Sequence, residues 1–371
     1  MSKFSSKSII YLYLILKLYS QSYIKGLIFY FSYYQYLIKC PELNTEVVRS
    51  DNDFYFLRDN LSKLYPKTVI PPLPHRSVFD NIKSEETNNI KMRDYQRFVN
   101  AVLENPLLRS SDIVEEFITK EQNEFNILKL KYKNLKQVVE TKNFVTLSGE
   151  LDATFYQKNF NLSTKYQKII EKKRGLLLKL NNSIKDVIYQ MDLINTKWKN
   201  LMEIFQDLSL LYRSNDENLS IFSNFGEYCK SISNINTLEK NFLQIDVKEF
   251  FKYIRLEYDE VDKLFNDYKY AKINFEGCEN NIISHKKNKS NNINNNEEVY
   301  KLELKQKELE KDNAKRLCCF LQNRTCEEYQ RILELHKNRI KNIFSKICPN
   351  IIETYKKEYE NLIKLINSFG N

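Results

Sequence analysis

The sequence is poor in the residues that most catalytic motifs require, with six glycines and three histidines among 371 residues. His75, His285 and His336 lie far apart, and none belongs to an HExxH motif or stands beside a nucleophile elbow. The scarcity of glycine leaves no phosphate-binding loop and no dinucleotide fingerprint. We therefore expect no catalytic residue, no cofactor and no enzyme activity.

The cysteines also lack a pattern. Seven is an odd number, and their spacing matches neither a disulfide framework nor a zinc site. Cys318, Cys319, Cys326 and His336 could be drawn as a metal site, but these residues do not share one face of a continuous helix. Reduced thiols in the cytosol, with no bound metal, are the simpler interpretation.

Proline is nearly absent from the C-terminal two-thirds of the chain. Six of the seven prolines lie at or before Pro106, and the next is Pro349. No proline therefore interrupts a helix between these two positions. Glycine is sparse there as well, so tight turns are few. Long helices are expected.

Apolar residues in this region recur at intervals of three and four, which is the spacing of a heptad seam. The clearest series is Leu177, Leu180, Ile184, Val187, Met191, Ile194, Trp198, Leu201, Phe205, Leu208 and Tyr212. Two similar series follow it and predict, with the first, helices at about 150–213, 217–284 and 297–369. The polar, Asn-rich residues 285–296 are expected to form an exposed tip loop. Three such helices cannot bury their apolar stripes alone, so we expect a dimer.

The first 35 residues are apolar and cannot be assigned to a domain. Lys3 and Lys7 precede an apolar run in a way that resembles a weak signal peptide, but the run is too short and too interrupted for a membrane-spanning helix. Residues 27–38 are rich in aromatic and β-branched side chains, which favours strands of a small sheet. A secreted or membrane-anchored protein that uses residues 9–38 is a third possible interpretation.

Residues 36–120 have the mixed pattern of an α+β domain. Two short strands around Pro41 precede a helical stretch at 54–64, and the prolines of residues 65–74 force an extended path. The segment 121–149 is expected to be an amphipathic linker, with an apolar stripe formed by Phe125, Leu128, Tyr132, Leu135 and Val139. That stripe could lie in a membrane interface or pack against the helical bundle.

This order of segments resembles the PX-BAR sorting nexins, in particular the sorting nexin four branch. The residues that carry the resemblance are Asp53-Phe54, Leu57, Tyr65-Pro66, 69–74, Arg97-Phe98, 105–108, 151–159 and 247–251. The resemblance implies a divergent or incomplete PX domain over 36–120, followed by an all-α BAR domain of three long helices, over 150–371, that forms an elongated dimer. Heptads alone would predict only a helical dimer.

The resemblance also implies a function and a partner. Such a protein would be cytoplasmic and peripheral on endosomal or related vesicle membranes. It would bind phosphoinositides or other anionic lipids, pair with itself or with another BAR-domain sorting nexin, and sense or generate curvature in sorting, recycling or autophagy-related traffic. The competing interpretation is a coiled-coil or tethering protein without lipid-specific binding.

The phosphoinositide pocket is only partly retained. In the family an Arg-Arg-aromatic run supplies the 3-phosphate ligand and a platform for the inositol ring, whereas this sequence reads Arg49-Ser50-Asp51. Arg49 remains, and Arg76 and Lys91 match two further basic positions of the family's pocket. Loss of the second arginine and of the aromatic residue predicts weak headgroup specificity.

Excess positive charge, +10 at pH 7, is spread along the whole chain. It suits an anionic membrane, and we expect no nucleic-acid partner although charge alone does not separate the two. Seven lysines are candidate membrane contacts: Lys165, Lys168, Lys172 and Lys179 at helical spacing, and Lys286, Lys287 and Lys289 at the expected tip. Each of them could equally be an ordinary solvated residue of a helix face.

Overall fold

The computed structural model describes residues 13–21, 31–73, 85–133, 153–214, 220–291 and 297–369. The chain divides into two compact units. Unit 1 comprises Met1–Ile170 and Leu256–Gln330, and unit 2 comprises Glu171–Arg255 and Arg331–Asn371. The small sheet and its surrounding helices belong to unit 1, together with parts of the long helices.

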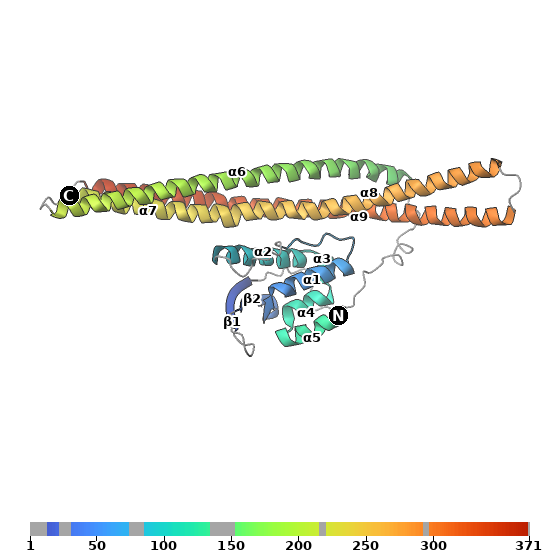
Figure 1. Ribbon diagram of the computed structural model, residues 1–371, viewed down its shortest axis with the longest axis horizontal. Coiled ribbons are helices and arrows are strands. Elements are labelled where there is room, and N and C mark those ends of the chain that lie inside the picture. The colour runs from blue at the N-terminus through green and yellow to red at the C-terminus, as the bar shows by residue number, and fades with distance from the viewer. Residues whose placement is uncertain are drawn as a thin grey trace. The chain divides into compact units, whose positions relative to one another are not determined.

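A three-stranded antiparallel sheet begins the described chain (Figure 1). Its strands are β1 (Tyr13–Gln21), β2 (Phe31–Cys40) and β3 (Thr45–Ser50), in that spatial order. β1 and the first half of β2 lie within the first 35 residues, which the sequence left unassigned. β2 overlaps residues 27–38, where strands were expected, whereas β1 was not expected. Lys3 and Lys7 before an apolar run resembled a signal peptide, but Tyr13–Gln21 pairs with β2 in the sheet.

Five helices surround this sheet: α1 (Asp51–Leu64), α2 (Glu85–Glu104), α3 (Pro106–Arg109), α4 (Asp112–Thr119) and α5 (Gln122–Lys133). N-terminal capping residues determine where two of these helices, α1 and α3, begin. The backbone N–H and the hydroxyl of Ser50 donate to the Asp53 carboxylate at 2.7 and 2.8 Å, which caps α1. Asn105 accepts a bond from the Leu107 N–H, and Pro106 occupies the first turn of α3.

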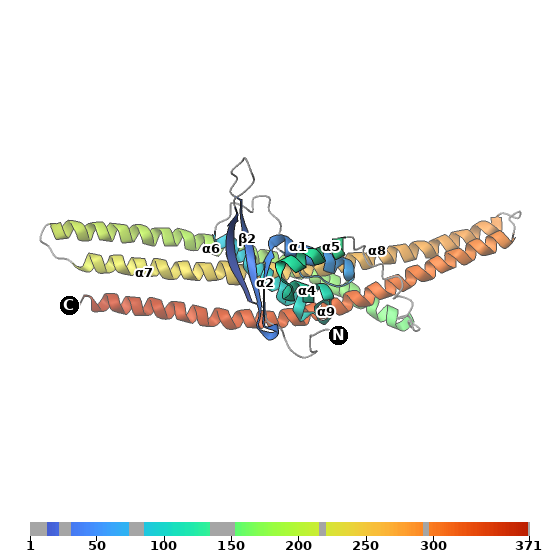
Figure 2. The same cartoon turned by 90° about the horizontal axis from the view of Figure 1, so that it is seen from below.

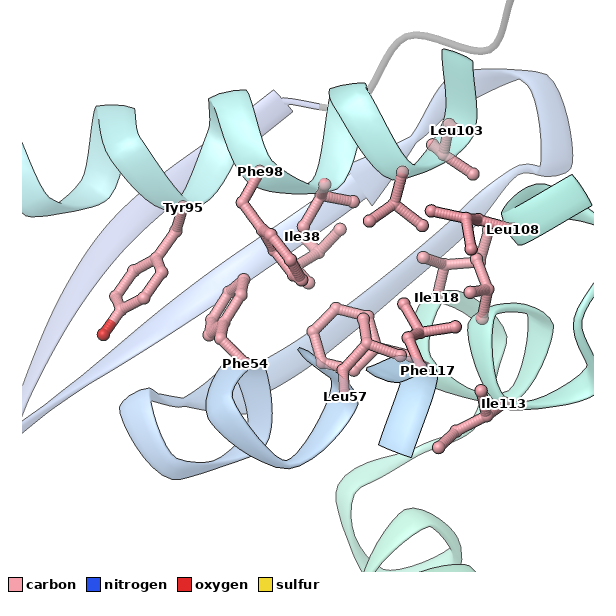
Figure 3. Packing of buried hydrophobic residues seen from close by; sticks show 14 of the residues in the cluster. Ile38, Phe54, Leu57, Tyr95, Phe98, Leu103, Leu108, Ile113, Phe117 and Ile118 are labelled. Atoms are coloured by element: carbon pink, nitrogen blue, oxygen red, sulfur yellow. The ribbon is translucent and has the colours of Figure 1, made fainter. Parts of the chain in front are cut away.

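The core of this domain is aromatic and is drawn from β2, β3 and all five helices. Figure 3 shows Phe54 and Leu57 of α1 facing Tyr95 and Phe98 of α2, with Phe117 of α4 completing the packing. The rings of Phe54 and Tyr95 stack with centroids 4.2 Å apart. Such aromatic contacts hold the sheet and the helices in one arrangement.

Helix α5 belongs to this core. Phe125 and Tyr132, seven residues apart on one face, are buried against it. This corrects the expectation that their stripe packs against the long helices or lies in a membrane interface. Leu135 and Val139 of the expected stripe lie outside the described residues.

The rest of the described chain consists of long helices (Figures 1 and 2). They are α6 (Ala153–Ser214), α7 (Ser220–Phe242), α8 (Glu249–Asn291) and α9 (Glu297–Asn367). A π-helical turn, η4 (Leu243–Lys248), joins α7 to α8, so both lie within the second expected helix. Helix α8 continues to Asn291, and the first part of the expected tip loop is therefore helical.

None of the helices described here is long and apolar enough to cross a membrane.

The PX-like core provides a direct test of this packing. Leu57 is fully buried, whereas Leu130 of α5 is 67% exposed. Leu57→Ala should lower the free energy of opening of the domain by about 2 to 5 kcal/mol, because it leaves a cavity in a packed core. Hydrogen exchange of the α1 and α4 amides measures this change. Leu130→Ala is the matched control, and equal effects of the two variants would contradict the packing.

Candidate functional site

Arg49, expected to contact phosphate, is buried inside the domain. Its guanidinium donates to the carbonyl oxygens of Val48 at 2.7 Å and Lys120 at 2.6 Å, and it lies 4.3 Å from the centroid of the Phe125 ring. Burial lowers the pKa of this group to about 10, which still leaves it charged at neutral pH. In this structure the Arg49 side chain turns toward main-chain acceptors in the core, so it does not face an open phosphate pocket.

Lys91 is also engaged within the protein. It lies on α2, is 7% exposed and forms an ion pair with Asp51 at the start of α1. The buried Tyr95 hydroxyl lies near the same carboxylate, and burial, followed by the negative charge of Asp51, raises the Tyr95 pKa. The Lys91 ammonium group, which the resemblance assigned to the inositol ring, is therefore already paired with the Asp51 carboxylate.

The other described residues of the expected pocket have structural roles. Ser50, which replaces the family's 3-phosphate ligand, is the N-cap residue of α1. Asp53 is fully buried, ion-paired with Lys129 of α5, and accepts a bond from Gln122 at 3.3 Å. Arg76 lies outside the described residues. The described part of the expected pocket thus offers two cations, and each has protein acceptors already.

The proline-rich turn after α1 is held by residues from the long helices of unit 1. Glu328 of α9 is buried and accepts a bond from the Val69 N–H at 3.0 Å. Arg324, one turn earlier, donates to the Lys67 carbonyl at 3.2 Å and to the Thr68 hydroxyl at 2.9 Å. Arg324 also pairs with Glu328 at 3.2 Å.

Two further ion pairs strengthen the contact between the turn region and α8. Arg58 of α1 donates to the Pro71 carbonyl and pairs with Glu260 at 2.9 Å. Lys67 pairs with Asp267 at 3.0 Å. Sequence reasoning missed all of these residues, since charged residues on a helix give no sign of a partner about 200 positions away.

The predicted membrane lysines lie on two helices. Lys165, Lys168, Lys172 and Lys179 are all exposed on α6. Lys286 and Lys287 are exposed near the end of α8, and Lys286 lies 3.9 Å from Glu308. Nearby, the His285 ring stacks on Tyr300 at 4.8 Å. Lys289 lies within α8, but its side chain is outside the described residues.

Unit 2 exposes many large apolar side chains. Leu176, Leu193, Leu201 and Leu210 on α6 and Ile352, Tyr355, Tyr359 and Ile366 on α9 are examples. A groove of about 470 Å³ lies among them, lined by residues that include Trp198, Tyr228, Tyr355 and Tyr359. Many large exposed apolar side chains beside such a groove are typical of a surface that binds another protein.

Three thiols of α9, those of Cys318, Cys319 and Cys326, are buried in unit 1. Cys318 and Cys319 are buried in α9, and Cys318 packs with Tyr268 and Leu321. Burial raises the pKa of Cys319, and raises that of Cys326 to about 11, so both thiols stay protonated at neutral pH. Across the described ranges, no three His, Cys, Asp or Glu side chains are grouped so that they could hold a metal ion.

Comparison with known proteins gives matches to both parts of the chain. Residues 41–121 match the PX domain family. Sorting nexin-4 of Cryptococcus neoformans is 36% identical over 78 residues, which cover 20% of this chain and 16% of that protein. Sorting nexin-4 of Eremothecium gossypii is 22% identical over 369 residues, which cover 87% of each chain.

A solved structure shares the fold of nearly the whole chain. It is the cryo-EM structure of the SNX-BAR Mvp1 tetramer, with a TM-score of 0.59, 18% sequence identity, and coverage of 97% of this chain and 100% of that chain. At this identity the likeness is one of fold. With a PX domain and long helices of this type, the chain has the architecture of the PX-BAR sorting nexins, as its sequence suggested.

Proposed function

We propose that this chain is a membrane-binding scaffold of the sorting nexin type. It acts as a dimer that binds anionic, phosphoinositide-containing endosomal membranes and senses or generates their curvature during endosomal sorting, recycling or autophagy-related traffic. The observation that carries the proposal is the similarity to a sorting nexin-4 over 87% of both chains, together with a shared fold. At this coverage the similarity extends well beyond the PX domain into the long helices.

The apolar surface of unit 2 supports dimerisation. Leaving so many aliphatic and aromatic side chains in water is unfavourable, and burying them contributes about 25 cal/mol per Å². A second copy, or another BAR-domain sorting nexin, carries helices of the same kind and can cover this surface. The Mvp1 protein in the structural comparison is a tetramer, which supports assembly among proteins of this fold.

Membrane attraction would come mainly from many dispersed lysines. Each basic residue near an anionic bilayer contributes about 1 kcal/mol, so several on one face are needed. Lys165, Lys168, Lys172 and Lys179 on α6, with Lys286, Lys287 and Lys289 on α8, are the proposed contacts. Arg76 is the proposed remaining phosphate ligand of the PX domain, because Arg49 and Lys91 already have acceptors.

A second candidate function is a tether without lipid-specific binding. The ion pair between Lys91 and Asp51 favours it, since a carboxylate already stands where a phosphate would be attracted. The two candidates differ in whether vesicles of equal charge are bound equally, and in whether bound vesicles become tubular.

Dimerisation can be tested by placing a charge in the apolar surface. Trp198→Asp and Leu201→Asp should each shift the full chain from dimer toward monomer, because a carboxylate would be buried without a partner. Light scattering at micromolar concentration measures the mass. A stable monomer of the unmodified chain under the same conditions would refute the proposal.

Removing the carboxylate at position 51 tests the pocket. Asp51→Asn should release Lys91 and tighten binding to vesicles with phosphatidylinositol 3-phosphate by roughly threefold to tenfold. Co-sedimentation measures it, with phosphatidylserine vesicles of equal charge as the lipid control. Asp112→Asn makes the same charge change at an exposed site of α4 and should have less effect. Strong selectivity of the unmodified chain for the 3-phosphate would contradict this account.

Charge reversal on α6 tests the membrane face. A quadruple Lys-to-Glu variant at positions 165, 168, 172 and 179 should remain dimeric but should neither pellet with anionic vesicles nor form tubules seen by electron microscopy. A single substitution should do little, since each contact contributes about 1 kcal/mol.

The matched control reverses four other exposed lysines, Lys341, Lys346, Lys356 and Lys357 of α9. It should retain more binding than the α6 variant. Equal loss in both variants would mean that total charge, and not the α6 face, governs binding. Full binding and tubulation by the α6 variant would refute the proposed contact face.

A further inference from the structure

The second long helical run contains a local irregularity. Between α7 and α8 the six residues of η4 adopt π-helical geometry, and the Glu249 N–H bonds the Gln244 carbonyl five residues earlier. Phe242 and Glu249, on either side, keep ordinary right-handed helical angles, so the helix continues through the irregular turn. A π-turn inside a longer helix changes the direction of its axis.

An asparagine from another helix inserts at the end of this turn. The side-chain amide of Asn181, on α6, donates to the Lys248 carbonyl at 3.1 Å and accepts from the Lys252 N–H at 3.2 Å. In a regular α-helix these two main-chain groups, four residues apart, bond each other. The amide therefore bonds both of the main-chain groups that pair with each other in a regular α-helix.

The surroundings hold this insertion in place. Val247 and Phe251 are buried on the same part of the helix, and the largely buried Glu249 carboxylate pairs with Lys252 at 2.7 Å. Because these buried residues flank the contact, a main-chain group that lost its partner there would be costly. Asn181 supplies a hydrogen-bond partner to both groups.

We propose that Asn181 is a positioning residue that fixes a bend at the junction of α7 and α8. An inserted side chain and a π-turn are two recognised causes of helix bending, and here they coincide. The effect on a membrane rests on the proposed function: the bend would set the curvature that the dimer imposes. Without the amide, the Lys252 N–H pairs with the Lys248 carbonyl and the helix straightens at this point.

The bend can be measured in solution with the full chain. Spin labels are introduced as unnatural amino acids at Leu238 and Tyr270, which are 63% and 72% exposed on either side of the turn. In Asn181→Ala the distance between the labels should increase. Asn182→Ala is the matched control, because the neighbouring asparagine is exposed on α6. An unchanged distance in Asn181→Ala, with helix content and dimer mass preserved, would overturn the proposal.

A membrane assay then tests the consequence. On phosphatidylcholine vesicles containing phosphatidylserine, Asn181→Ala should pellet like the unmodified chain but form wider tubules, and Asn182→Ala should leave the width unchanged. A longer label distance with unchanged tubule width would overturn the link to curvature. If the unmodified chain neither binds nor tubulates these vesicles, the proposed function fails, while the label distance still decides whether Asn181 fixes the bend.

Discussion

A buried charge must find acceptors inside the protein, and the PX domain depends on how Arg49 meets that requirement. Its guanidinium bonds the main chain at β3 and at the C-terminal end of α4, and the rings of Phe117 and Phe125 lie beside it. One side chain thereby joins the sheet, α4 and α5. The same geometry removes Arg49 from any surface pocket, so a residue that looks like a ligand in the sequence is part of the core.

The long helices and the proline-rich turn could be predicted because their signals are local. The absence of proline and the spacing of three and four follow directly from helix geometry, and the prolines of residues 65–74 restrict their own backbone. The role of Arg49 could not be predicted in this way, because its acceptor at Lys120 lies 71 residues away in the sequence. The pairing of Lys91 with Asp51 is likewise a product of tertiary packing.

The boundaries of the PX-like region could not be predicted from local sequence signals either. Strand β1 is a mainly apolar run that is also compatible with a signal sequence, and only its pairing with β2 distinguishes the two. Helix α5 has one apolar face, which any neighbouring surface could have covered. Its burial against the PX core was decided by Phe125 and Tyr132 meeting the aromatic residues of α1, including Phe56.

The contact between Glu328 and the proline-rich turn has an evolutionary consequence. Glu328 accepts its bond from the main chain at Val69, and Arg324 reaches the Lys67 carbonyl, so half of the recognition does not involve side chains of the turn. Nineteen of the twenty amino acids present such an N–H, and proline alone does not. Position 69 can therefore drift in sequence among descendants while this hydrogen bond persists, provided that the new side chain fits its buried setting.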